Sequence, residues 1–461
     1  MLFTQYYVEC LSQASYLIGD RDSGQAVIVD PRRDIGEYLA DAKANGLTIV
    51  GMINTHFHAD FVSGHLELAD ATGAWIGYGE AASTDFPVRH LAEGERISLG
   101  HVTLKILATP GHTPESISVL VFEHPDNEIA YGVLTGDALF IGDVGRPDLL
   151  ASIGFTADQL AIQLFHSVQT VLMGLPDAVR VFPAHGAGSS CGKNLSTERQ
   201  STIGEQRRLN YACQPMTQDQ FVQVVTADQP SAPPYFVYNA ILNRSEREHR
   251  PLTASPTALE DSSVDDALAA GALVLDTRTP TDFAAGHVIG SINVGADGRM
   301  AETVGMVLDP EQRVVLLSPD GQSDDDAMRM ARIGFDHVVG YIPDAEAYLE
   351  RNASRVEPAS RLTARQLADL MESVEGLTVV DLRNPGELTD GVLPGALRIP
   401  LAELVRRIDE INLAAPVVVY CAGGWRSSVA ASVLRSRGAK DVSDLIGGYS
   451  AWTLLHANAS G

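Results

Sequence analysis

One sequence pattern occurs twice in the carboxyl-terminal part of the chain, and this repeat restricts the fold more than any other feature. The segments LVLDTRTPTDFAAGHVIGSINV and LTVVDLRNPGELTDGVLPGALRIP align at an offset of 105 residues. The aligned pairs are Asp276 with Asp381, Gly286 with Gly391, and Gly290 with Gly395. A period of about 100 residues is too long for a solenoid. Because each copy alternates strands with helices, we predict two tandem α/β domains with parallel sheets, at residues 258–356 and 360–461.

Residues 1–250 form a different region that is rich in histidine. Nine of the thirteen histidines precede residue 190. Apolar runs such as QAVIVDP, TIVGMINTH and VRVFPAH contain many β-branched residues, which predicts short buried strands. Proline, serine and charged residues are frequent in residues 228–257, so we expect an extension that runs into a linker. The whole chain is therefore predicted to be a multidomain α/β protein.

The charge balance excludes several classes of partner. The chain has 59 acidic and 33 basic residues, and its net charge is −26. Because phosphate contacts need a basic surface, we expect neither nucleic acid nor an anionic membrane as a partner. No stretch approaches the roughly 18 apolar residues of a membrane span, and the start MLFTQYYVEC does not resemble a signal peptide. The four cysteines are scattered, so we expect a reducing, cytoplasmic compartment and no disulfides.

Histidines and aspartates stand directly after several predicted strands. They occur in the motifs THFHAD, TPGHTPES, LTGDALF and FPAHGAG. A lone histidine is usually an ordinary surface or core residue, but four such groups at strand ends converge on one rim of a sheet. We therefore predict a metal site there. The candidate residues are His56, His58, Asp60, His112, Asp137 and His185.

The order of these motifs resembles the metallo-β-lactamase fold, which implies an αββα sandwich for the first domain, residues 1–250. Binuclear hydrolases of this fold contain H-x-H-x-D-H, in which the last Asp-His pair holds a second metal. Phe61 stands at the position of that histidine, and a phenyl ring cannot bind a metal. We therefore expect a mononuclear centre. The alternative is that His65, four residues later in the chain, supplies the missing ligand.

The stretches THFHADFVSGH, ATPGHTPES and GDALFIGDVGRPDL are similar to the persulfide dioxygenases of this fold. This resemblance implies one Fe(II) per chain, held by His56, His112 and Asp137. Two histidines and one carboxylate leave three coordination positions open for substrates. Zinc is the alternative metal because it suits the same residues.

Other polar residues of this region are expected near the metal. The resemblance leaves His58, Asp60 and His185 to orient the ligands or the substrate. Arg146, in GDVGRPD, either meets an anionic group of the substrate or forms a surface salt bridge. Cys191 follows His185 by six residues; it either carries sulfur near the metal or is a small buried residue.

A cysteine loop in the second copy of the repeat is the other candidate site. In VVVYCAGGWRSSVAASVLRSRG, Cys421 follows a strand and precedes a glycine-bearing loop and a helix. Backbone N–H groups, the helix N-terminus and Arg426 all favour the reactive thiolate form. Only four residues separate this cysteine from the arginine, one fewer than in phosphatase loops. We therefore expect the loop to enclose a sulfane sulfur rather than a phosphoryl group.

The pattern C-x-x-G-x-R-S resembles the rhodanese family of sulfurtransferases. The resemblance implies that Cys421 takes up sulfur as a persulfide and passes it to an acceptor, with Arg426 as the second catalytic residue. The remaining residues of the sulfur-binding loop are Ala422, Gly423, Gly424, Trp425 and Ser427.

The first copy of the repeat lacks this loop. Ser318 aligns with Cys421, and PDGQSDDD replaces the glycine–arginine sequence. The serine has no base beside it in sequence, and Asp324, Asp325 and Asp326 are expected to repel an anionic substrate. We therefore predict that residues 258–356 are an inactive rhodanese-like domain.

The domain order resembles bacterial fusions of a persulfide dioxygenase with rhodanese domains that act in sulfide detoxification. The resemblance implies that O₂ oxidises a low-molecular-weight thiol persulfide to thiol and sulfite, while the rhodanese exchanges sulfane sulfur with sulfite or thiosulfate. Glutathione, coenzyme A and bacillithiol remain open as the carrier thiol. A homodimer or homotetramer is also expected by resemblance. The alternative is a zinc-dependent thioester hydrolase of the glyoxalase II type fused to a rhodanese, and Phe61 argues against it.

Overall fold

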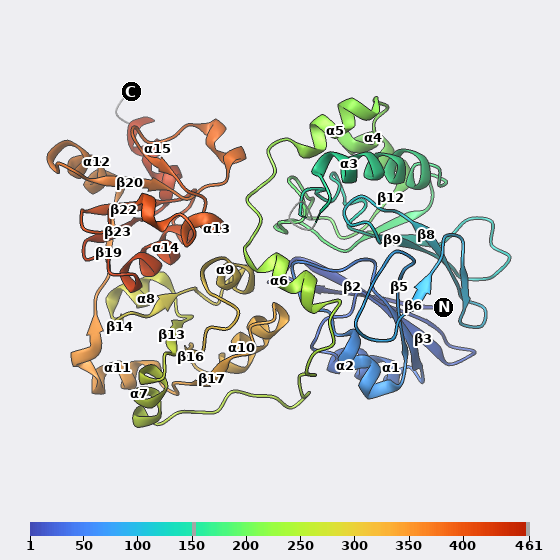
Figure 1. The fold of residues 1–461 in the computed structure, drawn as a ribbon, viewed down its shortest axis with the longest axis horizontal. Coiled ribbons are helices and arrows are strands. Elements are labelled where there is room, and N and C mark those ends of the chain that lie inside the picture. The colour runs from blue at the N-terminus through green and yellow to red at the C-terminus, as the bar shows by residue number, and fades with distance from the viewer. Residues whose placement is uncertain (150–153, 458–461) are drawn as a thin grey trace. The chain divides into compact units, whose positions relative to one another are not determined.

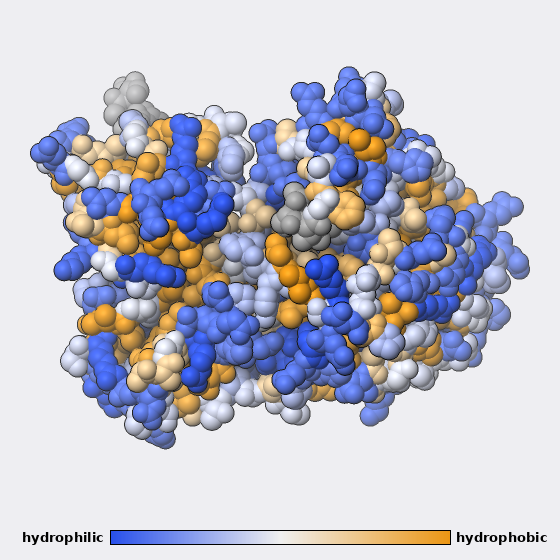
Figure 2. Space-filling view, viewed as in Figure 1, coloured by the Kyte–Doolittle hydropathy of each residue, from blue (hydrophilic) through white to orange (hydrophobic). Residues whose placement is uncertain are grey.

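The computed structural model describes residues 1–149 and 154–457, which divide into two compact units. The first unit contains Met1–Ala232 and Phe236–Ala254, and the second contains Pro233–Tyr235 and Ser255–Gly461. Hydrophilic residues cover much of the visible surface of both units (Figure 2), as the net charge of −26 leads one to expect. In the part of the chain that the structure covers, no helix is long and apolar enough to span a membrane.

The first unit is built from short strands and helices. Its strands are β1 Leu2–Val8, β2 Gln13–Asp20, β3 Gln25–Val29, β4 Thr48–Ile53, β5 Trp75–Gly79, β6 Arg89–Leu91, β7 Arg96–Ser98, β8 Thr103–Ala108, β9 Ile117–Phe122, β10 Gly132–Gly136, β11 Arg180–Pro183 and β12 Ser201–Thr202. Its helices are α1 Gly36–Ala44, α2 His65–Thr72, α3 Ala157–His166, α4 Ile203–Leu209, α5 Gln218–Thr226 and α6 Tyr235–Leu242, of which Tyr235 is grouped with the second unit.

Two sheets stack face to face in this unit, with helices on the outside (Figure 1). Their strand orders are β1-β2-β3-β4-β5-β6 and β12-β11-β10-β9-β8-β7. Buried aliphatic side chains of both sheets, among them Ile18, Val29 and Leu104, form one core between them. Helices α1 and α2 cover the outer face of the first sheet, and α3, α4 and α5 cover that of the second. The predicted αββα sandwich is confirmed.

The second unit contains the two copies of the repeat. The strands of the first copy are β13 Leu273–Asp276, β14 His287–Val288, β15 Ile292–Asn293, β16 Val314–Leu317, β17 Val338–Tyr341 and β18 Val356–Glu357. Those of the second are β19 Ser360–Leu362, β20 Thr378–Asp381, β21 Leu397–Arg398, β22 Val417–Tyr420 and β23 Val442–Leu445. The helices are α7 Asp261–Ala269, α8 Pro280–Ala285, α9 Met300–Val307, α10 Ser323–Arg332, α11 Ala345–Arg351, α12 Ala364–Ser373, α13 Leu401–Leu404, α14 Trp425–Ser436 and α15 Gly448–Ala457.

Each copy has its own sheet, in the order β15-β13-β16-β17 in the first and β19-β23-β22-β20-β21 in the second. Neighbouring strands in both sheets run parallel, which confirms the prediction of parallel α/β domains. The carboxyl ends of parallel strands share one edge of a sheet, where loops carry functional groups. Strand β22 leads to Cys421 and α14, just as β16 leads to Ser318 and α10.

Candidate functional sites

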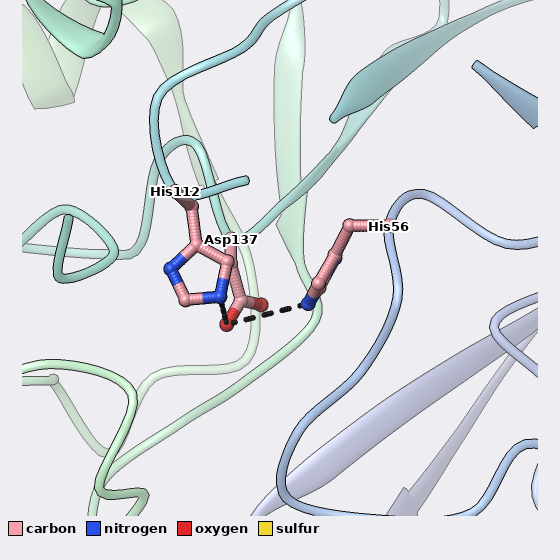
Figure 3. Close-up of side chains that lie close together, drawn as sticks. All are labelled: His56, His112 and Asp137. Atoms are coloured by element: carbon pink, nitrogen blue, oxygen red, sulfur yellow. Dashed lines mark ion pairs between the residues drawn. The ribbon is translucent and has the colours of Figure 1, made fainter. Parts of the chain in front are cut away.

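Three strand ends of the first unit bring His56, His112 and Asp137 together. These residues follow β4, β8 and β10, respectively, and all three are buried. The Nε2 atoms of His56 and His112 lie 3.9 Å and 3.4 Å from Oδ2 of Asp137, and Figure 3 shows both rings directed at that carboxylate. One ligand atom from each residue lies within 4.8 Å of the others. The three residues predicted as ligands therefore form one cluster.

Hydrogen bonds orient both imidazole rings of this cluster. Nδ1 of His112 lies 2.9 Å from the carbonyl oxygen of Arg146, and Nδ1 of His56 lies 3.0 Å from the hydroxyl of Thr55. With Nδ1 engaged, Nε2 of each ring is left to face the carboxylate. Burial, together with the neighbouring imidazoles, lowers the pKa of His56 well below its usual value. This histidine is therefore neutral, which is the form that binds metals.

The donor atoms of the cluster fit a metal ion. Among the described residues, Nε2 of His56 and both carboxylate oxygens of Asp137 have no hydrogen-bond partner, although they are buried. Buried acceptors without a partner are costly, and a cation removes that cost. Imidazole and carboxylate ligands in this combination suit iron and zinc alike.

A second buried group adjoins the first and consists of His58, Asp60 and His185, with ligand atoms within 4.8 Å of one another. Nε2 of His185 lies 3.4 Å from the Asp60 carboxylate and 3.5 Å from that of Asp137. Nε2 of His58 lies 2.9 Å from Asp30. Although burial opposes it, the Asp30 carboxylate raises the pKa of His58. The predicted role of this group, to orient the ligands or the substrate, stays a prediction. Its ligand atoms are also close enough to hold a metal ion themselves.

Phe61, which stands where the resemblance leads us to expect a ligand of a second metal, packs beside His58. Its side chain is fully buried, and its ring centroid lies 4.3 Å from that of His58. His65 lies on α2, where its ring packs 5.0 Å from Phe86, and burial lowers its pKa to about 3. Among the described residues, His65 belongs to no group of potential metal ligands. The structure therefore gives no support to a second metal site completed by His65.

The sequence did not decide whether Cys191 carries sulfur or is a small buried residue. In the structure it lies at the edge of the metal cluster. Its Sγ is within 4.8 Å of ligand atoms of Asp137 and His185. Burial, reinforced by the negative charges of Asp60 and Asp137, raises the pKa of the thiol well above its usual value. This shift favours the neutral thiol as long as no cation is bound beside it. Together with Asp137 and His185, Cys191 also forms a group that could hold a metal ion.

Arg146 contacts the metal region through its backbone. Its guanidinium forms two hydrogen bonds with Asp148, at 2.7 Å and 2.6 Å, and is buried. Its carbonyl oxygen holds His112, and its N–H donates to the carbonyl of Cys191 at 2.9 Å. Arg146 was expected either to meet an anionic group of the substrate or to form a surface salt bridge. The structure shows a salt bridge, with Asp148, but the guanidinium is buried and not at the surface.

The sulfur-binding loop surrounds Cys421 with backbone and side-chain groups. The N–H of Gly424 donates to the cysteine Sγ at 3.1 Å, and the Ser427 hydroxyl lies 3.7 Å from it. Gly424 has φ 99°, a left-handed conformation that suits glycine, and α14 begins at the next residue. The Arg426 guanidinium donates to both carboxylate oxygens of Glu387, at 2.7 Å and 2.6 Å. Although burial opposes it, Glu387 and then Cys421 raise the pKa of Arg426.

The corresponding loop of the first copy has different chemistry. The Ser318 hydroxyl donates to Asp326 at 2.7 Å, and the Thr277 hydroxyl donates to the same oxygen at 2.6 Å. Ser318 has no base beside it in the sequence, as predicted. In the folded structure, however, the Asp326 carboxylate lies within hydrogen-bond distance of its hydroxyl. This carboxylate is fully buried and does not form part of a repelling acidic surface. Ser323 stands where the second copy has Arg426, so the loop has neither a thiol nor a guanidinium.

The loop between β4 and α2, the metal loop that carries His56 and His58, is fixed by two residues that were not predicted. Asp30 has φ 51°, and its carboxylate accepts from the N–H and hydroxyl of Thr55 at 2.7 Å and 2.9 Å. Asp30 directly follows the apolar run QAVIV, so its place at a strand end could have marked it as a site residue. Asn243 donates to the carbonyl oxygens of His58 and Phe61, both at 2.7 Å. No local pattern marks Asn243, because its partners lie about 180 residues earlier.

Comparison with known proteins agrees with this architecture. Residues 8–185 match the metallo-beta-lactamase superfamily, and residues 260–347 and 363–455 each match the rhodanese-like domain. A solved metallo-beta-lactamase structure from Staphylococcus aureus subsp. aureus COL superimposes with a TM-score of 0.67 at 33% identity, covering 74% of this chain and 99% of that one. The fold and site thus define a metallo-beta-lactamase superfamily protein with two rhodanese-like domains.

The relatives of the first unit narrow this class. The chain is 32% identical over 216 residues to the mitochondrial persulfide dioxygenase ETHE1 of Bos taurus, covering 46% of this chain and 75% of that protein. It is also 35% identical over 133 residues to a hydroxyacylglutathione hydrolase of Hyphomonas neptunium, covering 28% of this chain and 49% of the hydrolase. The chain belongs to the persulfide dioxygenase family.

Proposed function

We propose that the first unit is a mononuclear iron persulfide dioxygenase and that the second copy of the repeat is a sulfurtransferase. The observation that carries the first half is the cluster of His56, His112 and Asp137, whose buried donor atoms face one another. Membership of the persulfide dioxygenase family supports iron over zinc. The reaction proposed is R–S–SH + O₂ + H₂O → R–SH + SO₃²⁻ + 2 H⁺.

The protein residues hold and surround the reacting groups. Bound Fe(II) would supply the redox chemistry that O₂ requires, which zinc cannot. Thr55 and the Arg146 carbonyl keep the two imidazoles in the orientation that ligation needs. Phe61 adds a buried apolar ring beside His58. The thiol of Cys191, within 4.8 Å of ligand atoms of Asp137 and His185, would lie beside the bound substrate.

A pocket of the first unit is where we place the carrier part of the persulfide. Its lining includes Phe57, Ala59 and Thr113, which are sequence neighbours of the metal cluster. Apolar side chains of α6 form another wall. Arg244 is the one cation of this lining, and within the described residues no acidic side chain pairs with it. Such a pocket suits a thiol with an apolar or amide-containing arm and an anionic end, which includes glutathione and coenzyme A.

Replacing Arg244 by glutamine is expected to raise KM for glutathione persulfide about tenfold with little change in kcat, because one charge-assisted hydrogen bond to the carrier is lost. KM for a small uncharged alkyl persulfide should stay the same. Steady-state O₂ uptake measures both. The matched control is Arg208→Gln on the exposed face of α4. An unchanged KM for glutathione persulfide would remove Arg244 from the carrier site.

In the second unit, Cys421 is proposed to carry the transferred sulfur. The thiolate attacks the sulfane sulfur of thiosulfate, the S–S bond breaks, and sulfite leaves as the dianion, so that a cysteine persulfide remains. With R–S–SH as donor, the thiolate attacks the outer sulfur, the S–S bond breaks, and the thiolate R–S⁻ leaves instead. The Gly424 N–H and the amino end of α14 stabilise the negative sulfur. The persulfide then passes to a thiol or to sulfite, and concentrations set the direction.

Sulfite links the two activities, because the first unit releases it and the second can accept sulfur onto it. We propose a cytoplasmic homodimer or homotetramer that acts in sulfide detoxification. The deciding experiment is the iron and zinc content of protein purified without oxygen, combined with O₂ uptake on glutathione persulfide. About one iron per chain and rapid uptake are expected. Two zincs with no uptake would instead favour the glyoxalase II type of thioester hydrolase.

A further inference from the structure

We propose that Glu387 is a positioning residue of the sulfur-binding loop and that its charge makes the loop discriminate against doubly charged sulfur donors. This inference rests on the sulfurtransferase activity proposed above. Its motivating observation is the two-pronged ion pair with Arg426, at 2.7 Å and 2.6 Å. The pair occupies two of the five N–H donors of the guanidinium and fixes its plane.

The backbone around Glu387 is anchored, so the carboxylate is held in place. Glu387 lies on a short 3₁₀ helix, Pro385–Asp390, that follows β20. Arg383 binds both carboxylate oxygens of Asp381 and donates to the carbonyls of Glu387 and Gly391 at 3.2 Å and 2.7 Å. The Glu387 carboxylate also accepts from the N–H of Asn384 at 2.9 Å. Moving this glutamate away from Arg426 would break several of these contacts.

The first copy of the repeat has the same backbone anchor but lacks the ion pair between Glu387 and Arg426. Arg278 binds Asp276 and the carbonyl of Gly286, the latter at 2.8 Å, as Arg383 does in the second copy. Asp282 stands in place of Glu387 but accepts from the Thr279 hydroxyl at 2.7 Å. Ser323 stands in place of Arg426. The ion pair thus accompanies the reactive cysteine and not the scaffold.

The position of the carboxylate has a consequence for donor choice. Arg426 is the cation that approaches Cys421, and its charge is balanced by Glu387 before any substrate binds. Thiosulfate is a dianion and therefore gains less from this arginine than from an uncompensated one. A protonated persulfide is uncharged at its reacting sulfurs. It therefore loses little attraction to Arg426 when Glu387 balances the charge of the arginine. Both side chains of the pair are partly exposed, so solvent moderates the effect.

Two substitutions separate charge from anchoring. Glu387→Gln keeps the size and a hydrogen-bond acceptor, whereas Glu387→Ala removes both. For the glutamine variant, the ratio of kcat/KM with thiosulfate to kcat/KM with an alkyl persulfide is expected to rise about three- to tenfold. For the alanine variant, kcat is expected to fall with both donors because Arg426 loses its anchor. Asp282→Asn in the first copy is the matched control and should leave kcat/KM unchanged with both donors.

A second readout does not need sulfur transfer. Alkylation of Cys421 by iodoacetate and by iodoacetamide, followed by mass spectrometry of its peptide, compares an anionic with a neutral reagent on one thiol. The ratio of the iodoacetate rate to the iodoacetamide rate should rise in Glu387→Gln. An unchanged alkylation ratio together with an unchanged donor ratio would overturn the role of Glu387. Absence of sulfur transfer in the unmodified protein, with a raised alkylation ratio, would overturn the sulfurtransferase and keep the role of Glu387.

Discussion

Replacing Asp137 by asparagine is expected to empty the metal site and to reduce O₂ uptake on glutathione persulfide by more than about 100-fold, because even residues outside the ligand set change metal affinity by 10- to 100-fold. The carboxylate is the single anionic member of the predicted ligand set and faces both imidazoles (Figure 3). Metal analysis of protein purified without oxygen and an O₂ electrode measure the two effects.

The same substitution should leave the fold intact. Both oxygens of Asp137 are buried without a hydrogen-bond partner among the described residues. An amide of nearly the same size in that place can donate a hydrogen bond to Nε2 of His56. Sulfur transfer by Cys421 in the same protein is the internal control. Full metal content and normal O₂ uptake in Asp137→Asn would show that this cluster is not the metal centre.

Replacing Cys421 by serine is expected to reduce sulfur transfer below about 1% while leaving O₂ uptake on a supplied persulfide unchanged, because a hydroxyl is a far weaker nucleophile than a thiolate. The substitution changes one buried atom in a loop whose other contacts remain. Sulfite release from thiosulfate and O₂ uptake, measured on one preparation, give both activities. Equal loss of the two would contradict the proposed division of labour.

The first copy of the repeat supplies a matched control. Ser318→Cys places a thiol in the corresponding loop, where Ser323 replaces the arginine and Asp326 accepts the hydrogen bond. Burial raises the pKa of Asp326. With no guanidinium and an acid beside it, this cysteine is expected to stay protonated and to add no sulfur transfer. Cys213→Ser, in the core of the first unit, should affect neither activity.

The predictable parts of both sites are those that a strand end determines. A chemically active residue directly after an apolar strand lies at a sheet edge, so the convergence of the histidine and aspartate motifs was predictable from the strand pattern. The choice of His56, His112 and Asp137 among them came from the family resemblance. The cysteine loop was predictable for the same reason, since β22, the glycines and α14 are contiguous. The two parallel-sheet domains followed from the repeat, because strands that alternate with helices have few other arrangements.

The parts that were missed depend on contacts between distant segments. Asn243 reaches the metal loop from the carboxyl-terminal extension, and Glu387 reaches Arg426 across 39 residues. For Arg146 a salt bridge was one of the two expectations, but its partner Asp148 and its burial inside the fold could not be predicted from the sequence. Polar residues like these carry no periodicity, so their partners are visible only after the chain has folded.

The hydrogen bonds of Asn243 also set an order of events during protein synthesis. A ribosome delivers the chain from its amino end, so the segment with His56 and His58 emerges about 180 residues before Asn243 does. Until then, the carbonyls of His58 and Phe61 lack the amide of Asn243, and the loop is held by earlier segments alone, among them Asp30, which accepts hydrogen bonds from Thr55. The set of contacts around this loop is therefore completed only after residue 243 has been translated.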